Sequence, residues 1–123
     1  MASREHVVVL GASPDSDRYS NKAMHLLAAH GHHVIPVSTV YTEIEGEPVF
    51  KDLGAVTGPV DTLTLYLSPK RLLPITADII RLQPGRVIFN PGTETPEVQA
   101  ALDAAGIPWL EACTLVMLRT GQF

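Results

Sequence analysis

Apolar residues gather in five short runs along the chain, at residues 7–10, 33–37, 62–67, 86–89 and 107–110. Each run has the length of a strand, and polar or glycine-containing turns bound it. Longer amphipathic stretches begin near residues 20, 68 and 95, and a short apolar stretch follows at residues 115–118. The pattern therefore predicts strands that alternate with helices, with a short helix near the end.

Boundary residues support these helices. A hydroxyl side chain that can cap a helix stands at each predicted start, at Ser20, Ser68 and Thr95. Proline occupies the first helical position of the second and third helices. The first and third helices are predicted to end at Gly31 and Gly106. Pro74 is predicted to distort or break the first turns of the second helix, which otherwise extends to about residue 82.

Strands that alternate with helices imply right-handed crossovers and a parallel sheet. The strands are almost wholly apolar, which a sheet covered on both faces requires. We predict an α/β, Rossmann-like, three-layer α/β/α fold with a five-stranded parallel sheet, in one domain over residues 1–123. The predicted strand order is 3-2-1-4-5, and the flavodoxin-like order 2-1-3-4-5 is the alternative. Residues 44–49 are predicted to form a turn with a residue or two of edge strand, and residues 51–56 a short helix or loop.

Ligands of open parallel sheets bind beyond the carboxyl-terminal strand ends. Four loops rich in Gly, Ser, Thr, Asn and Pro are predicted to meet there, at residues 11–21, 38–42, 68–70 and 90–93. The first of them leads from a strand into a helix, and the free N–H groups of a helix start attract phosphate. Arg18 and Lys22 add positive charge beside that start. The first loop is therefore the predicted phosphate site.

The first loop does not have the composition of an NAD site. Gly11-Ala12-Ser13 offers one glycine where the dinucleotide fingerprint needs three. The second strand ends in Val37-Ser38-Thr39, without the acidic residue that holds the ribose hydroxyls of NAD. A Gly-Lys-Ser/Thr phosphate loop is also missing from the sequence. We therefore expect a ligand other than NAD.

The composition of the chain limits the classes of binding partner that we expect. The chain is 46% hydrophobic and 18% charged, with a formal net charge of −4, which argues against nucleic acid or an anionic membrane as the main partner. No apolar run is long enough to span a bilayer, and the first residues do not have the layout of a signal peptide. Cys113 is the only cysteine, which suits a reducing cytoplasm. We expect a cytoplasmic protein with a small-molecule nucleotide ligand; a homodimer or a protein partner stays open.

Several segments, in this order and spacing, resemble the CoA-binding domain family: residues 9–13, 18–22 and 31–37, Ile44-x-Gly46, Val60-Asp61 and Cys113. Members of this family are small stand-alone Rossmann-like proteins that resemble the N-terminal domain of the succinyl-CoA synthetase alpha subunit. The resemblance covers nearly the whole chain. It implies coenzyme A or acyl-CoA as the ligand.

The resemblance also implies where the parts of CoA lie. Gly11, Ser13, Arg18 and Ser20 would surround the pyrophosphate, and Ser38 and Thr39 would lie near the adenosine. Tyr66, Leu67 and Ser68 would flank the adenine or the pantetheine, and Asn90 and Gly92 would line the far end. The full set of predicted ligand-binding residues is Gly11, Ala12, Ser13, Arg18, Tyr19, Ser20, Asn21, Ser38, Thr39, Tyr66, Leu67, Ser68, Asn90, Gly92 and Thr93.

Two departures from the family pattern concern the ends of the ligand. Relatives often carry Trp-x-Gln-x-Gly after the fourth strand, where this chain has Phe89-Asn90-Pro91-Gly92-Thr93. No Lys or Arg lies between Gly31 and Lys51, where one could hold the 3′-phosphate of CoA, although His32, His33 or Lys51 could substitute.

The sequence contains no convincing catalytic set. His30, His32 and His33 cluster without a neighbouring carboxylate or cysteine, so we interpret them as side chains at a helix end rather than as metal ligands. A non-catalytic CoA or acyl-CoA binding protein is the first hypothesis. A regulatory or interaction domain with a vestigial pocket and an apolar tail at residues 115–123 comes second. An enzyme of acyl or nucleotide chemistry that uses Asn90, Thr93 or Glu94 comes third.

Overall fold

The computed structural model describes residues 4–123. Seven strands are present there: β1 (His6–Leu10), β2 (His33–Val37), β3 (Glu43–Ile44), β4 (Glu47–Pro48), β5 (Thr62–Leu65), β6 (Arg86–Phe89) and β7 (Trp109–Glu111). The helices are α1 (Tyr19–Ala29), α2 (Pro69–Leu72), α3 (Thr76–Leu82), α4 (Pro96–Ala105) and α5 (Thr114–Arg119), with 3₁₀ turns η1 (Leu53–Ala55) and η2 (Leu73–Ile75). The predicted alternation of strands and helices is confirmed.

Five of the strands form one parallel sheet in the order β2-β1-β5-β6-β7. The predicted α/β Rossmann-like fold class is confirmed. Numbered along the chain, the order is 2-1-3-4-5, so the predicted order 3-2-1-4-5 is wrong and its alternative is correct.

The predicted order required another strand along the outer edge of β2, and local features of β2 explain its absence from the described sheet. Beyond β2, residues 4–123 make only a single parallel bridge, between Val37 and Phe50. The amide of Ser38 donates to the Phe50 carbonyl, and the Phe50 amide donates to the Pro36 carbonyl. Pro36 faces the same outer side and has no N–H to extend this pairing. Among the described residues, pairing on this side of β2 therefore does not extend beyond this single bridge.

The segment before Phe50 folds back on itself instead. β3 and β4 pair antiparallel as a separate hairpin, with Ile44 opposite Glu47. Glu45 and Gly46 between them have φ values of 52° and 82°, as a type I′ turn requires. The predicted short turn with a residue or two of strand is thus a hairpin outside the main sheet. The 3₁₀ turn η1 fills the place predicted for a short helix or loop.

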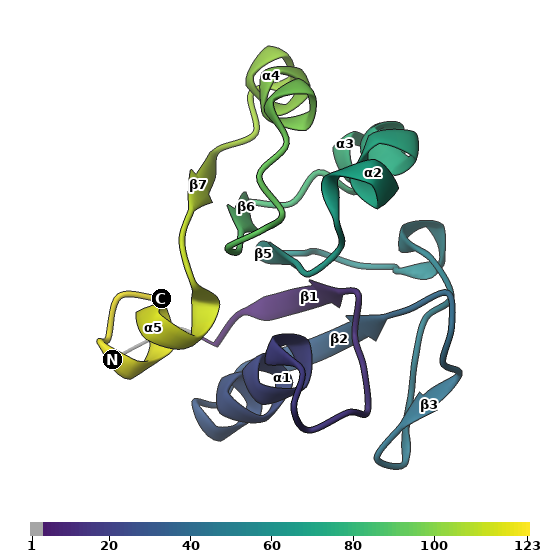
Figure 1. Cartoon of the computed structure of the whole chain (residues 1–123), viewed down its shortest axis with the longest axis vertical. Helices are drawn as coiled ribbons and strands as arrows, with labels where there is room; N and C mark the ends of the chain where they lie inside the picture. The colour runs from purple at the N-terminus through teal and green to yellow at the C-terminus, as the bar shows by residue number, and fades with distance from the viewer. Residues whose placement is uncertain (1–3) are drawn as a thin grey trace.

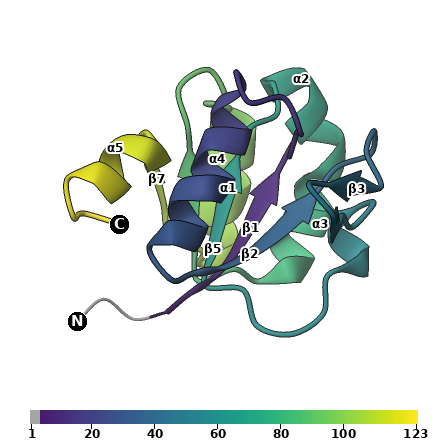
Figure 2. The same cartoon turned by 90° about the horizontal axis from the view of Figure 1, so that it is seen from below.

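Helices cover both faces of the sheet (Figures 1 and 2). α1 and α5 lie against one face, where Val7 and Val9 pack with Met24, Leu27 and Leu118. α2, α3 and α4 lie on the other face, where the sheet and helices bury one continuous cluster that includes Leu63, Val87, Phe89, Ile79 and Leu102. The layers are those of a three-layer α/β/α fold.

One helix boundary differs from the sequence-based prediction. Arg18, and not Ser20, is the N-cap of α1, and Ser20 lies in the first turn with 4% of its surface exposed. Ser20 is therefore not a capping residue. Pro74 has the predicted effect, because the stretch from Pro69 to Leu82 is divided into α2, η2 and α3. None of the helices within residues 4–123 is long and apolar enough to cross a membrane.

Candidate functional site

The loop between β1 and α1 lies across the ends of both neighbouring strands. The amides of Gly11 and Ala12 both donate to the Val37 carbonyl at the end of β2, at 3.0 and 3.1 Å. On the other side, the Tyr66 amide donates to the carbonyl of Leu10 at 2.9 Å. Gly11 has a φ of +93°, and a Cβ there would lie 2.9 Å from the carbonyl oxygen of Tyr66. Only glycine fits this position without displacing its neighbours.

Side-chain hydrogen bonds hold the rest of this loop. The hydroxyl of Ser13 accepts from the amide of Asp15 at 3.1 Å, and the side chain of Asn21 donates to the Ser13 carbonyl at 2.9 Å. Asp15 accepts from the amide of Asp17 through its side chain and from the amide of Arg18 through its carbonyl. Ser13 and Asn21 are both buried. Their side chains shape the loop from within and leave its outer side to backbone groups.

The start of α1 presents free donors. Within residues 4–123, the amides of Tyr19, Ser20 and Asn21 have no hydrogen-bond acceptor, and the first helical bond runs from Lys22 to Arg18. Such groups carry partial positive charge. Arg18 is exposed beside them, and in the described part of the chain it takes part in no ion pair. The nitrogen of Lys22 lies 5.6 Å from the centre of the Tyr19 ring. An anion could be held here by backbone and guanidinium donors together.

Ser38 and Thr39 follow β2 at the same edge of the sheet. Ser38 is buried, and its hydroxyl accepts from the amides of Val40 and Tyr41 at 3.0 and 3.2 Å. The Ser38 oxygen thus accepts two backbone amides, and this Ser-turn shapes the loop. Thr39 is exposed, and so are Val40 and Tyr41, at 69% and 39%. Val40 and Tyr41 were not among the predicted site residues, although they directly follow Ser38 and Thr39.

Asn90 has a structural position at the end of β6. Its side-chain nitrogen donates to the Thr64 hydroxyl at 2.7 Å and to the Leu65 carbonyl at 2.8 Å. Its side-chain oxygen accepts from the amide of Thr114 at 2.9 Å. The hydroxyls of Thr64 and Thr114 also bond to each other at 2.8 Å. With 3% of its surface exposed, Asn90 connects β5, β6 and α5.

Some of the other predicted residues at this edge are exposed, and others form hydrogen bonds within the loops. Leu67 is half-buried against Gly11, and Ser68 is exposed as the N-cap of α2. The Gly92 amide donates to the side chain of Glu94, and the buried Thr93 hydroxyl donates to the Asn90 carbonyl. Thr114 was missed by the sequence analysis. Its place directly before an apolar helical stretch was the only available signal.

The pKa of Tyr66 lies above its usual value. Burial raises the pKa of Tyr66 above 10.0, hydrogen bonds from Thr64 and Thr114 oppose this, and the nearby Cys113 raises it further. The neutral phenol is therefore the form that the fold accommodates.

We expect the stability of the protein to fall as the pH rises above 10.0. Between the pKa of the unfolded chain, 10.0, and the higher folded pKa, the native state binds more protons, so the free energy of unfolding decreases with pH. The urea midpoint measured on both sides of pH 10.0 should fall less in Tyr66→Phe than in the parent protein. Tyr41→Phe is the control, because Tyr41 is exposed. Equal alkaline losses in all three proteins would contradict this expectation.

Parallel strands place the four predicted loops at one edge of the sheet. The hydrogen bonds above join the first loop to the end of β2, and the segment after β5 to the end of β1. Two hollows of the surface lie beside α1: one is shared with α5 and includes Ser16, Asn21 and Lys22, and the other follows β2. Residues 4–123 contain no cluster of three or more side chains suited to a metal ion.

These features define an open α/β domain of the Rossmann type with polar loops at its carboxyl-terminal edge. A family model described as CoA binding domain matches residues 5–119. The chain belongs to this CoA-binding domain family.

Solved structures share this fold. An uncharacterized protein of known crystal structure is 40% identical, with a TM-score of 0.92 over 99% of this chain and 100% of that chain. A protein from Thermus thermophilus is 30% identical, with a TM-score of 0.89 over 98% of this chain and 91% of that chain. The dinucleotide-forming acetyl-coenzyme A synthetase 1 of Ca. Korarchaeum cryptofilum, in complex with phosphate and ADP, is 16% identical. Its TM-score of 0.74, over 86% of this chain and 25% of that chain, shows a shared fold alone. No curated protein matches the chain.

Proposed function

We propose that this protein binds CoA or acyl-CoA without acting on it, and that the pyrophosphate lies between the β1–α1 loop and the start of α1. The observation that carries this proposal is the row of free amides at Tyr19, Ser20 and Asn21 beside the exposed Arg18. Membership of the CoA-binding domain family supports CoA as the ligand. A pyrophosphate suits these donors because it offers several charged acceptor oxygens.

The rest of the ligand would follow the edge of the sheet. The adenosine would lie over Ser38 and Thr39, and the pantetheine would pass Tyr66, Leu67 and Ser68 toward Gly92 and Thr93. Thr39 takes the place at which NAD-binding domains carry an acidic residue, which supports CoA over NAD.

The hydrogen bonding of the predicted site supports binding without catalysis. The side chains of Ser13, Ser38 and Asn90 are engaged in bonds that shape the loops, and Thr93 donates its hydroxyl proton to a carbonyl. A general base must reach a proton of the substrate. These four polar groups are better suited to positioning the backbone than to moving a proton.

We expect CoA to bind with measurable heat and Arg18→Ala to weaken it about tenfold, because a charge-assisted hydrogen bond to phosphate is lost. Calorimetry with CoA, acetyl-CoA, dephospho-CoA, ADP and NAD measures this, and the dephospho-CoA arm shows whether the 3′-phosphate is recognised. Arg81→Ala is the matched control, because Arg81 forms an exposed ion pair with Asp78 on α3. Absence of heat from all five compounds would contradict CoA binding. Equal losses in the two variants would contradict the placement of the phosphates.

A further inference from the structure

The outer edge of β2 is open over half of its length. Along a strand, the N–H and C=O groups of successive residues point to alternate sides. His33 and Val37 bond toward β1, whereas Pro36 and Ser38 bond outward to Phe50. The backbone N–H and C=O of Val34 therefore point to the same outer side as the backbone groups of Pro36 and Ser38. Within residues 4–123, neither of these two groups of Val34 has a hydrogen-bond partner. An exposed strand edge of this kind is a template for pairing with another chain.

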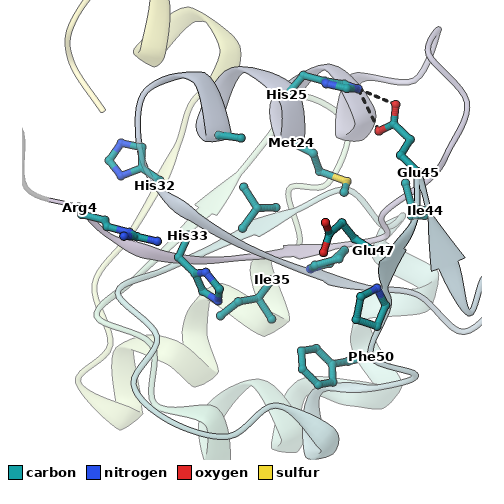
Figure 3. Close-up of a pocket in the computed structure, with 14 residues that line it drawn as sticks. Arg4, Met24, His25, His32, His33, Ile35, Ile44, Glu45, Glu47 and Phe50 are labelled. Carbon is teal, nitrogen blue, oxygen red and sulfur yellow. Dashed lines mark hydrogen bonds and ion pairs between the residues drawn. The ribbon is translucent and has the colours of Figure 1, made fainter.

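A groove follows this open edge. It has a volume of about 460 Å³ and lies between α1, β2 and the β3–β4 hairpin (Figure 3). Its lining is largely apolar and includes Met24, Val34, Ile35, Ile44 and Phe50. The side chains of His25 and Glu45, 3.0 Å apart, join the hairpin to α1. The groove is therefore bounded by the hairpin on one side and by α1 on the other.

Charge is distributed unequally along the groove. Arg4 lies with His32 and His33 at the end where β2 begins, whereas Glu45 and Glu47 belong to the hairpin on the other side of the groove (Figure 3). In the described part of the chain, neither Arg4 nor Glu47 forms an ion pair. Arg4 thus gives one end of the groove a positive charge, and Glu47 gives the other end a negative charge. A partner with the reverse order of charges would complement both.

We propose that this edge is a homodimer interface, in which β2 pairs antiparallel with β2 of a second copy about a two-fold axis at Val34. An antiparallel arrangement places Arg4 of each copy beside the acidic hairpin of the other, so the surface complements itself. The N–H and C=O of Val34 exchange hydrogen bonds with their symmetry mates. Pro36 cannot donate, and its carbonyl is already bonded to Phe50, so the pairing stays short and closes as a dimer.

The backbone part of this interface is tested by Val34→Pro. The variant removes an N–H that faces away from β1, so the bonds of β2 to β1 are retained. We expect the dissociation constant of the dimer to rise about tenfold or more in analytical ultracentrifugation. Val34→Ala is the matched control, because it trims the side chain and keeps the N–H, and its dissociation constant should change less. Equal effects of the two variants would overturn the strand pairing.

The charge complementarity of the proposed interface is tested by exchanging the charges of Arg4 and Glu47. Arg4→Glu and Glu47→Arg should each weaken the dimer about tenfold by placing like charges together, and the double variant should regain most of the parent affinity. A merely structural role of either residue would not be rescued in this way. A parent protein that remains monomeric at millimolar concentration, or a double variant no better than the single ones, would overturn the proposal. CoA binding by these variants reports on the carboxyl-terminal edge of the sheet separately, so failure of the dimer leaves the proposed function standing.

Discussion

Replacing Gly11 with alanine is expected to lower the free energy of unfolding by about 3 kcal/mol and to abolish measurable CoA binding. Two costs add at this position. A φ of +93° is strained for any residue with a side chain, and the new Cβ would lie 2.9 Å from the Tyr66 carbonyl oxygen and 3.0 Å from a methyl group of Leu67. Relief of that overlap requires the β1–α1 loop to move away from β5. The start of α1 would move with it, and its free amides would leave the positions that the proposed phosphate site requires.

Gly58→Ala separates the two costs. Gly58 has a φ of +87°, close to that of Gly11, but a Cβ there would meet nothing within 4 Å. We expect this variant to lose only about 1 kcal/mol, the cost of the backbone conformation alone, and to retain CoA binding. Urea denaturation of both variants gives the stabilities, and calorimetry gives the affinities. Equal losses of stability would show that the close approach to Tyr66 has no energetic effect.

Asn90→Ala is expected to destabilise the protein by about 3 kcal/mol, because it leaves several buried polar groups without partners. The Leu65 carbonyl and the amide of Thr114 would each lose a side-chain bond, of 2.8 and 2.9 Å respectively. The Thr64 hydroxyl would lose its bond from Asn90 and keep its bond to Thr114. Asn90 is 3% exposed, so water cannot readily replace the lost partners.

The matched control is Asn21→Ala, the same substitution at another buried asparagine. Asn21 makes one side-chain hydrogen bond, to the carbonyl of Ser13. We expect it to lose about 1 kcal/mol in urea denaturation, and to weaken CoA binding by loosening the β1–α1 loop. A variant of Asn90 that is as stable as the parent protein but binds CoA more weakly would show that the side chain contacts the ligand instead.

The placement of the loops could be predicted because it depends on local patterns. The run of apolar residues from Val7 and the glycine at position 11 are visible in the sequence, and the parallel arrangement follows from the alternation of elements. The hydrogen-bond partners of individual side chains could not be predicted in this way. The partners of Ser13 lie close in sequence, at Asp15 and Asn21, but those of Asn90 come from positions 24 to 26 residues away. Sequence patterns do not reveal which distant carbonyl a buried amide will meet.

The order of the strands in the sheet was likewise not predictable from local patterns. Both candidate orders are compatible with five apolar runs, because the runs specify strands and not their neighbours. The choice depends on the outer side of β2, where Pro36 has no N–H and Phe50 makes the only bridge in the described chain. Pro36 was visible from the start, but its outward direction became apparent only from the pairing of β2 with β1.

By itself, the amino-acid sequence determined which segments are strands and helices and which loops carry the glycine and the cations, since hydrophobic period, caps and prolines act over a few residues. The tertiary structure alone decided the order of the strands, the burial of Asn90 and the groove beside β2. Each of these depends on contacts between residues far apart in the chain, and such contacts are selected by the packing of whole elements, which no local pattern contains.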